Sequence, residues 1–355
     1  MKISMICFSL TGRETGERLL QAFLEEGEEA HLAKKSRYLP DGISVSLGEW
    51  TREAFGRSEA VIFIGACGIA VRAIAPLVAS KKTDPAVLVI DECGGFVISL
   101  LSGHLGGANE LAIRAAAILG ARPVVTTATD LHRRFAVDVF AKNLDCSLFH
   151  MDGAKEVSAA LLAGKDVGFY SEFPWEGELP AGLVPCDERG RPLDGAAAKE
   201  PLETGVAVTV RRDCLPFFYT AQVVPRTVVL GMGCRKGKEA EAVFAMADAC
   251  LEKQGLRRES LMALASIVLK KEEPGLLALS ERLGIPFFTY TREDLLEAEG
   301  SFTPSEFVRG VTGVDNVCER SAILGSGQGR LIQRKMAQGG VTAALAQKNW
   351  RIDFE

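Results

Sequence analysis

Strand-type and helix-type runs alternate through the first 130 residues of this 355-residue chain. The strand-length apolar runs are Ile3 to Phe8, Ala60 to Ile64, Ala86 to Ile90, Phe96 to Leu101 and the start of Arg122 to Asp130, and helical spacing is found in Glu14 to Glu26 and from Ile69 onward. Strands that alternate with helices are typical of a parallel sheet with helices on both faces. The alternation therefore predicts an N-terminal doubly wound α/β domain over residues 1–130.

A second doubly wound α/β domain is predicted over residues 226–355. Thr227 to Leu230 has the composition of a strand, and an amphipathic helix follows it to about Lys253. Near the end of the chain, Leu331 to Lys335 and Val341 to Leu345 are expected to be paired or neighbouring strands.

Residues 131–225 have a less regular pattern. Helices are expected near Phe135 to Leu144 and Ala154 to Leu162, Pro and Gly gather between Pro174 and Gly205, and Leu215 to Pro225 is interpreted as a linker. The predicted fold class is therefore α/β, with two doubly wound α/β domains joined by a smaller, less regular α/β middle region.

The composition argues against several classes of protein. Apolar residues make up 47% of the chain and charged residues 25%, as in soluble globular proteins, and the net charge of −5 argues against a nucleic-acid partner. The apolar runs are only strand-length, so we expect no membrane segment, and Ile3 to Phe8 is interpreted as a strand instead of a signal peptide. The nine cysteines form no C-x-x-C pair and no zinc-type cluster with the four histidines. We therefore expect a reduced, cytoplasmic protein without a metal site, and the oligomeric state is left open, a homo-oligomer included.

The segment from Leu101 to Glu110, Leu-Ser-Gly-His-Leu-Gly-Gly-Ala-Asn-Glu, is the strongest candidate site. It joins a predicted strand to a predicted helix, so we expect it at the carboxyl end of a buried parallel strand. Its glycines allow a ligand to approach the backbone, and unpartnered N–H groups at the start of the helix would bind an anion. His104 could transfer a proton near neutral pH, with a structural histidine as the alternative. Glu110 could take part in catalysis or could only interact with the helix dipole.

Other glycine turns lie next to predicted strands. Gly231 to Gly237 resembles a dinucleotide fingerprint, but its third glycine is one position late, which argues against nucleotide binding. Cys67 and Cys234 each lie in such a turn, where a helix N-terminus could lower the pKa of the thiol, and simple packing is the alternative. For the cations near strand ends, such as Lys270, solvated surface charge is the alternative to ligand binding.

Six blocks of sequence, in this order, resemble the cobalt-precorrin-5A hydrolase family, also called CbiG. The blocks are Gly65 to Arg72, Ser102 to Ala112, Thr126 to Asp130, Gly231 to Gly237, Ala265 to Lys270 and Gly313 to Arg320. The last third of the chain alone also resembles CobE, a small protein of the aerobic cobalamin route, but the Ser102 to Ala112 block favours the hydrolase. The resemblance covers nearly the whole chain and is weakest over residues 140–225.

The resemblance implies a step of anaerobic cobalamin biosynthesis. Water opens the δ-lactone of a ring-contracted cobalt corrinoid, and acetaldehyde is released to give cobalt-precorrin-5B. The cobalt belongs to the substrate, so no cofactor is expected, and neighbouring enzymes of the pathway are candidate partners. Two other functions stay open: a non-catalytic corrinoid carrier, which would need the same cations but no proton-transfer residue, and a nicotinamide-dependent oxidoreductase.

The site residues follow from this chemistry. His104 would activate the water, while N–H groups from Gly106 to Ala108 would hold the oxyanion or a peripheral carboxylate. Cations in a cleft between the two α/β domains would bind the acetate and propionate groups of the substrate. The predicted catalytic residues are His104 and Glu110, and the predicted substrate-binding residues are Cys67, Gly68, Arg72, Ser102, Gly103, Gly106, Gly107, Ala108, Asn109, Thr127, Asp130, Gly233, Cys234, Arg235, Lys236, Lys270 and Glu319.

Overall fold

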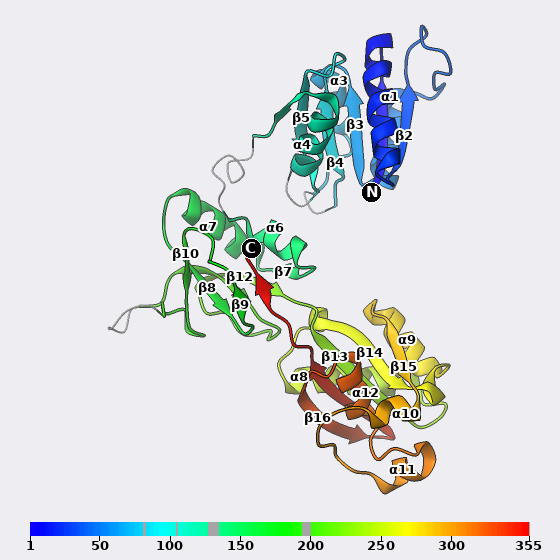
Figure 1. The fold of residues 1–355 in the computed structure, drawn as a ribbon, viewed down its shortest axis with the longest axis vertical. Helices are drawn as coiled ribbons and strands as arrows, with labels where there is room; N and C mark the ends of the chain where they lie inside the picture. The colour runs from blue at the N-terminus through cyan, green and yellow to red at the C-terminus, as the bar shows by residue number, and fades with distance from the viewer. Residues whose placement is uncertain (81–82, 104–105, 127–134, 194–199, 355) are drawn as a thin grey trace. The chain divides into compact units, whose positions relative to one another are not determined.

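The computed structural model of the chain describes residues 1–80, 83–103, 106–126, 135–193 and 200–354 (Figure 1). It divides into two compact units, Met1–Val139 and Phe140–Glu355, and each is described here by itself. The fold class is α/β, as the sequence predicts.

The first unit has a six-stranded sheet in the order β2-β1-β3-β4-β5-β6. Its elements are β1 (Lys2–Cys7), α1 (Leu10–Glu25), β2 (Glu29–Lys34), α2 (Leu47–Arg57), β3 (Ala60–Ile64), α3 (Cys67–Ile74), β4 (Ala86–Ile90), β5 (Phe96–Leu101), α4 (Ala108–Leu119) and β6 (Arg122–Val124). Successive side chains of a strand point to opposite faces, so Ile62 packs with α1 and α4 on one face while Phe63 packs with α2 and α3 on the other. Helices on both faces confirm the predicted architecture.

The direction of one strand in this sheet differs from the prediction. β5 is antiparallel to β4, with Val87 opposite Leu101 and Ile90 opposite Val97. Only residues 91–95 join the two strands, too few for the crossover that a parallel pair needs. The Asp91 carboxylate closes this turn by accepting the N–H of Phe96 at 2.6 Å. The expected parallel strand is therefore wrong, and β5 ends at the sheet edge where β1, β3 and β4 begin.

The second unit begins with the middle region, where a five-stranded sheet has the order β10-β8-β11-β12-β7. Its elements are α6 (Val137–Asn143, which crosses the unit boundary), β7 (Ser147–Phe149), α7 (Met151–Leu162), β8 (Val167–Ser171), β9 (Trp175–Glu176), β10 (Leu183–Pro185), β11 (Thr204–Val208) and β12 (Tyr219–Val224). The two expected helices are confirmed as α6 and α7. The expected linker from Leu215 to Pro225 is wrong, because β12 is a buried strand between β11 and β7.

The C-terminal region has a second five-stranded sheet, in the order β15-β14-β13-β17-β16. Its elements are β13 (Val228–Cys234), α8 (Ala240–Lys253), η1 (Arg258–Ser260), β14 (Leu261–Ile267), η2 (Val268–Lys270), α9 (Pro274–Leu283), β15 (Phe287–Tyr290), α10 (Arg292–Leu296), α11 (Glu306–Thr312), α12 (Cys318–Gly325), β16 (Arg330–Gln338), β17 (Val341–Gln347) and β18 (Ile352–Asp353). β13, β14 and β15 are parallel, so their carboxyl ends share one edge. β16 and β17 pair antiparallel, which confirms the expected pairing of the last two runs.

The last residues of the chain return to the middle region (Figure 1). β18 pairs with β9, with Ile352 opposite Trp175. The ring of Phe354 stacks on Phe140 with centroids 5.5 Å apart. This tail therefore fastens the middle region to the end of the C-terminal sheet.

Candidate functional site

The corner after β5 is a loop closed by its own backbone. The N–H of Ala108 donates to the carbonyl of Ser102 at 3.1 Å, and the N–H of Asn109 donates to the carbonyl of Gly103 at 3.0 Å. The Ser102 hydroxyl donates to the carbonyl of Asp84 at 3.0 Å, which ties the corner to the loop before β4. The expectation that these first helical N–H groups lack partners is therefore wrong for Ala108 and Asn109, whose N–H groups close the loop instead.

The glycines of the corner are required by packing. A Cβ on Gly103 would lie 2.8 Å from Oδ1 of Asn109, and a Cβ on Gly106 would overlap the side chain of Ser102. Gly107 has a φ of 78° as the N-cap of α4, in the left-handed region that favours glycine. Loop closure thus accounts for all three glycines, whether or not a ligand binds.

The corner and the Gly65 to Arg72 turn do not meet at one edge of the sheet. Gly65 follows the carboxyl end of β3, whereas the corner follows β5, which runs in the opposite direction. Cys67 and Gly68 are exposed at the start of α3, and the Arg72 guanidinium donates to the carbonyl of Gly68 at 3.2 Å. Within this unit, the predicted site residues therefore divide between two opposite edges.

The structure does not test the functional roles predicted for several residues of the first unit. His104, Thr127 and Asp130 lie outside the described residues. Glu110 is exposed in the first turn of α4, and Asn109 is buried. Their roles stay predictions.

The C-terminal region presents a cationic loop at the shared carboxyl edge of β13 and β14. We use this name for residues 235–239 together with Lys270 of the turn after β14. Arg235 and Lys236 are exposed, and neither forms an ion pair with any residue that the structure describes. The Arg235 N–H donates to the carbonyl of Gly340 at 3.0 Å, so the β16–β17 turn supports this side of the loop. The predicted cations Arg235, Lys236 and Lys270 thus lie at one sheet edge.

Glu273 joins the two parts of the cationic loop. Its carboxylate accepts a hydrogen bond from Nζ of Lys270 at 2.8 Å and another from the N–H of Gly237 at 2.7 Å. Burial by itself would raise the pKa of Glu273, but these hydrogen bonds outweigh burial and the pKa is lowered. The carboxylate is therefore held in its charged form.

Gly231 and Gly233 are strand residues, contrary to the expectation that β13 ends at Leu230. β13 continues through Cys234, and α12 packs directly on it: a Cβ on Gly231 would overlap the carbonyl oxygen of Cys318. Gly231 therefore serves helix packing, and neither glycine forms a pyrophosphate turn because both lie within β13. Burial raises the pKa of the half-buried Cys234 thiol, more than the nearby Lys270 lowers it, which argues against an activated nucleophile there.

Glu319 supports the fold. Its side chain is fully buried, with an exposed fraction of 0%. Its carboxylate accepts the N–H and the hydroxyl of Thr303 at 2.7 and 2.8 Å, and the N–H of Lys335 at 2.7 Å. Because donors of this chain occupy both carboxylate oxygens, the expectation that Glu319 contacts substrate is wrong.

Comparisons with known proteins agree in all three regions of the chain. Family models match residues 49–130 (Cobalamin synthesis G N-terminal), 135–225 (Cobalamin biosynthesis central region) and 228–346 (Cobalamin synthesis G C-terminus). Over 298 residues, 83% of each chain, the protein is 42% identical to the cobalt-precorrin-5A hydrolase of Salmonella typhimurium. The chain belongs to the cobalt-precorrin-5A hydrolase family. The family's protein from Priestia megaterium is 33% identical, over 82% of this chain and 79% of its own.

This family member also resembles a shorter protein over about a third of its length. Protein CobE of Sinorhizobium sp is 38% identical over 122 residues, which are 34% of this chain and 79% of CobE. The predicted resemblance to both proteins is thus confirmed.

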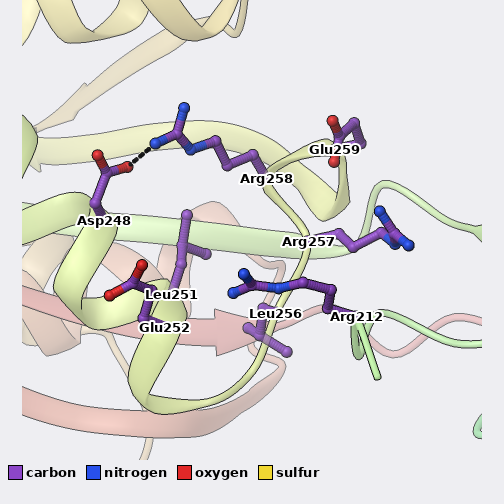
Figure 2. A pocket seen from close by; sticks show the side chains of 8 residues that line it. All are labelled: Arg212, Asp248, Leu251, Glu252, Leu256, Arg257, Arg258 and Glu259. Carbon is purple, nitrogen blue, oxygen red and sulfur yellow. Dashed lines mark hydrogen bonds and ion pairs between the residues drawn. The ribbon is translucent and has the colours of Figure 1, made fainter. Parts of the chain in front are cut away.

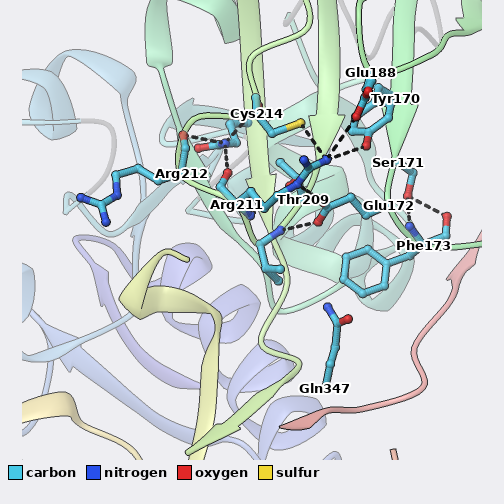
Figure 3. A network of polar contacts seen from close by, with 12 residues as sticks. Tyr170, Ser171, Glu172, Phe173, Glu188, Thr209, Arg211, Arg212, Cys214 and Gln347 are labelled. Atoms are coloured by element: carbon cyan, nitrogen blue, oxygen red, sulfur yellow. Dashed lines mark hydrogen bonds and ion pairs between the residues drawn. The ribbon is translucent and has the colours of Figure 1, made fainter. Parts of the chain in front are cut away.

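The central region of this family member holds a polar network that the sequence analysis missed. Arg211 forms an ion pair with Glu172 and donates to the hydroxyl of Tyr170 at 3.1 Å (Figure 3). Burial, as the largest cause, raises the pKa of Tyr170 to about 12. The network joins β8 to residues after β11, and no sequence motif signals it because its members are about 40 positions apart.

A cavity of about 250 Å³ lies where the middle and C-terminal regions of the second unit meet (Figure 2). It is lined by Arg212, Asp248, Leu251, Glu252, Leu256, Arg257, Arg258 and Glu259. Arg258 donates to Asp248 at 2.7 Å, and Arg257 reaches the other way, to Gln222 at 2.5 Å. Three arginines and three carboxylates line this cavity, so its charges are balanced and do not favour an anionic ligand over a cationic one.

Two features are absent from the part of the chain that the structure describes. No group of three or more His, Cys, Asp or Glu side chains there could hold a metal ion. No described helix is long and apolar enough to cross a membrane.

Proposed function

We propose that the protein hydrolyses cobalt-precorrin-5A, the reaction for which its relatives in Salmonella typhimurium and Priestia megaterium are named. The observation that carries this proposal is the 42% identity over 298 residues, which spans all three regions. A shared fold alone would not support it, because α/β domains host many chemistries.

The chemistry needs a base and a group that stabilises negative charge. Water attacks the lactone carbonyl, and the ring C–O bond breaks to leave a carboxylate and an alkoxide. The alkoxide then collapses to acetaldehyde as a C–C bond breaks, and the macrocycle takes up the electron pair. We assign proton removal from the water to His104 and the oxyanion to the backbone around Gly106 and Gly107.

The cationic loop supplies the complementary charge for substrate binding. The corrinoid carries several acetate and propionate groups, and Arg235 and Lys236 are exposed cations without ion-pair partners among the described residues. We assign peripheral carboxylates to them and to Lys270. The cobalt arrives and leaves with the substrate, so the protein needs no cofactor of its own, and we place the reaction in the cytoplasm beside the other enzymes of the pathway.

The test is turnover of the purified protein under anaerobic conditions. Cobalt-precorrin-5A is incubated with the wild type and His104→Ala, and acetaldehyde and the mass of the corrinoid are measured. The proposal expects acetaldehyde and the delactonised product from the wild type, with binding but little turnover in His104→Ala. If the wild type bound the substrate without turnover, the result would indicate a carrier instead. If the wild type neither bound nor turned over the substrate, the proposed function would be refuted.

A further inference from the structure

We infer that Glu273 is a positioning residue for substrate binding, which fixes the direction of the Lys270 ammonium and the shape of the cationic loop. The inference rests on the proposed function, in which that loop binds the carboxylates of the substrate. Glu273 itself would not touch substrate, because its side chain is buried beneath the loop.

The contacts of Glu273 connect two segments that are separate in the sequence. One oxygen, Oε2, accepts from Lys270 in the turn after β14, and the other, Oε1, accepts from Gly237 in the loop after β13. Gly237 has a φ of 69°, so the loop turns at the residue that Glu273 holds. A single carboxylate thus fixes both carboxyl-end segments relative to each other.

The start of α9 is built to bring this carboxylate under the loop. Glu273 is the N-cap of α9, and Pro274 follows it at the first helical position. A Cβ on Gly275 would lie 3.1 Å from the carbonyl oxygen of Lys238, so the helix approaches the loop closely. On the other side, Gly340 accepts from Arg235. The loop is therefore supported from two sides.

Positioning and simple charge balance predict opposite effects on binding. If Glu273 only neutralises Lys270, its removal makes the loop more positive, and an acidic substrate should bind more tightly. If Glu273 positions Lys270, its removal frees the long side chain, and binding should weaken although the loop is more positive. The sign of the change in KM therefore separates the two.

The experiment compares Glu273→Gln with Glu272→Gln in the acetaldehyde assay. Glu272 is exposed and adjacent, so its substitution removes the same charge without the buried contacts. We expect Glu273→Gln to raise KM roughly tenfold with little change in kcat, as for loss of one charge-assisted hydrogen bond that orders a binding group. Glu272→Gln should leave KM unchanged or lower it. In a Lys270→Met background, Glu273→Gln should raise KM less than it does in the otherwise wild-type protein, because only the contact with Gly237 is then left to lose.

A second measurement does not depend on turnover. Amide exchange of peptides that cover residues 234–239 should be faster in Glu273→Gln than in the wild type, and unchanged in Glu272→Gln. Equal exchange in all three proteins, or a lower KM in Glu273→Gln, would overturn the inference. A wild type that releases no acetaldehyde would refute the proposed function, while faster exchange in Glu273→Gln would still show that Glu273 orders the loop.

Discussion

Replacing Gly231 by alanine should destabilise the C-terminal region severely, although the change adds one methyl group. The new Cβ would overlap the carbonyl oxygen of Cys318 and would lie 2.9 Å from the Cβ and from the backbone nitrogen of Ala322. The overlapped atom belongs to the backbone of α12, so no side-chain rotation can remove the clash. The whole helix must move away from β13.

The loss of stability in Gly231→Ala depends on the core residues that α12 buries. Its buried residues Ala322 and Ile323 form one core cluster with Ala346 of β17, and displacement of the helix opens that cluster. Overpacking of a tight core costs about 1–3 kcal/mol, and a clash with backbone belongs at the upper end, so we expect a loss of about 3 kcal/mol. For a unit of this size, that is a fall in Tm of roughly 6–12 °C.

Scanning calorimetry of the full chain would measure this change. The matched control is Gly310→Ala, which makes the same substitution in the exposed helix α11, where a Cβ meets no atom within 4 Å. The Gly310→Ala control should leave the free energy of unfolding unchanged, or raise it by up to about 1 kcal/mol because alanine has the higher helix propensity. If Gly231→Ala and Gly310→Ala had the same Tm, the packing role of Gly231 would be wrong.

Three further changes test other parts of the structure. Glu319→Ala leaves the buried donors of Thr303 unsatisfied and should cost about 2–4 kcal/mol in urea unfolding, whereas an unchanged midpoint would contradict the structural role. Phe354→Ala removes the ring stacked on Phe140 and should increase proteolysis of the C-terminal tail, and equal cleavage rates in the variant and the wild type would argue against the fastening role. The pKa of Glu273 is lowered below its ordinary 4.5, so its contribution to stability is full above that pH and is lost as the pH falls through the folded-state pKa. The difference in Tm between the wild type and Glu273→Gln should therefore shrink in calorimetric scans as the pH falls below 4.5 and through the lower pKa of the folded state, and a constant difference would refute this linkage.

Local pattern was enough to find many strands and helices of the two outer regions, but not β2, α2 or the strands of the middle region. Apolar runs such as Ala60 to Ile64 and Val341 to Leu345 are strands because their composition and length suit a buried strand and little else. The order of the six sequence blocks was not needed for this step, but it did give the family resemblance that the comparisons confirm.

The direction of a strand and its neighbours in the sheet were decided only by the tertiary structure. The run from Phe96 to Leu101 has the composition of a strand whichever way it runs. Because β5 is antiparallel to β4, the predicted corner lies at the opposite edge of the sheet from Cys67. The segment containing β12 resembled a linker because prolines flank it, yet its position between β11 and β7 buries it.

The sequence by itself determined the α/β class, the cations Arg235 and Lys236 as candidates, and the family, since these depend on residue type and local order. The tertiary structure decided that Gly231 packs against α12, that Glu319 is enclosed, and that Glu273 holds Lys270. These roles come from contacts between segments far apart in the chain. Burial and hydrogen-bond partners are properties of the packed molecule, so the same carboxylate can be a ligand or a structural support according to what surrounds it.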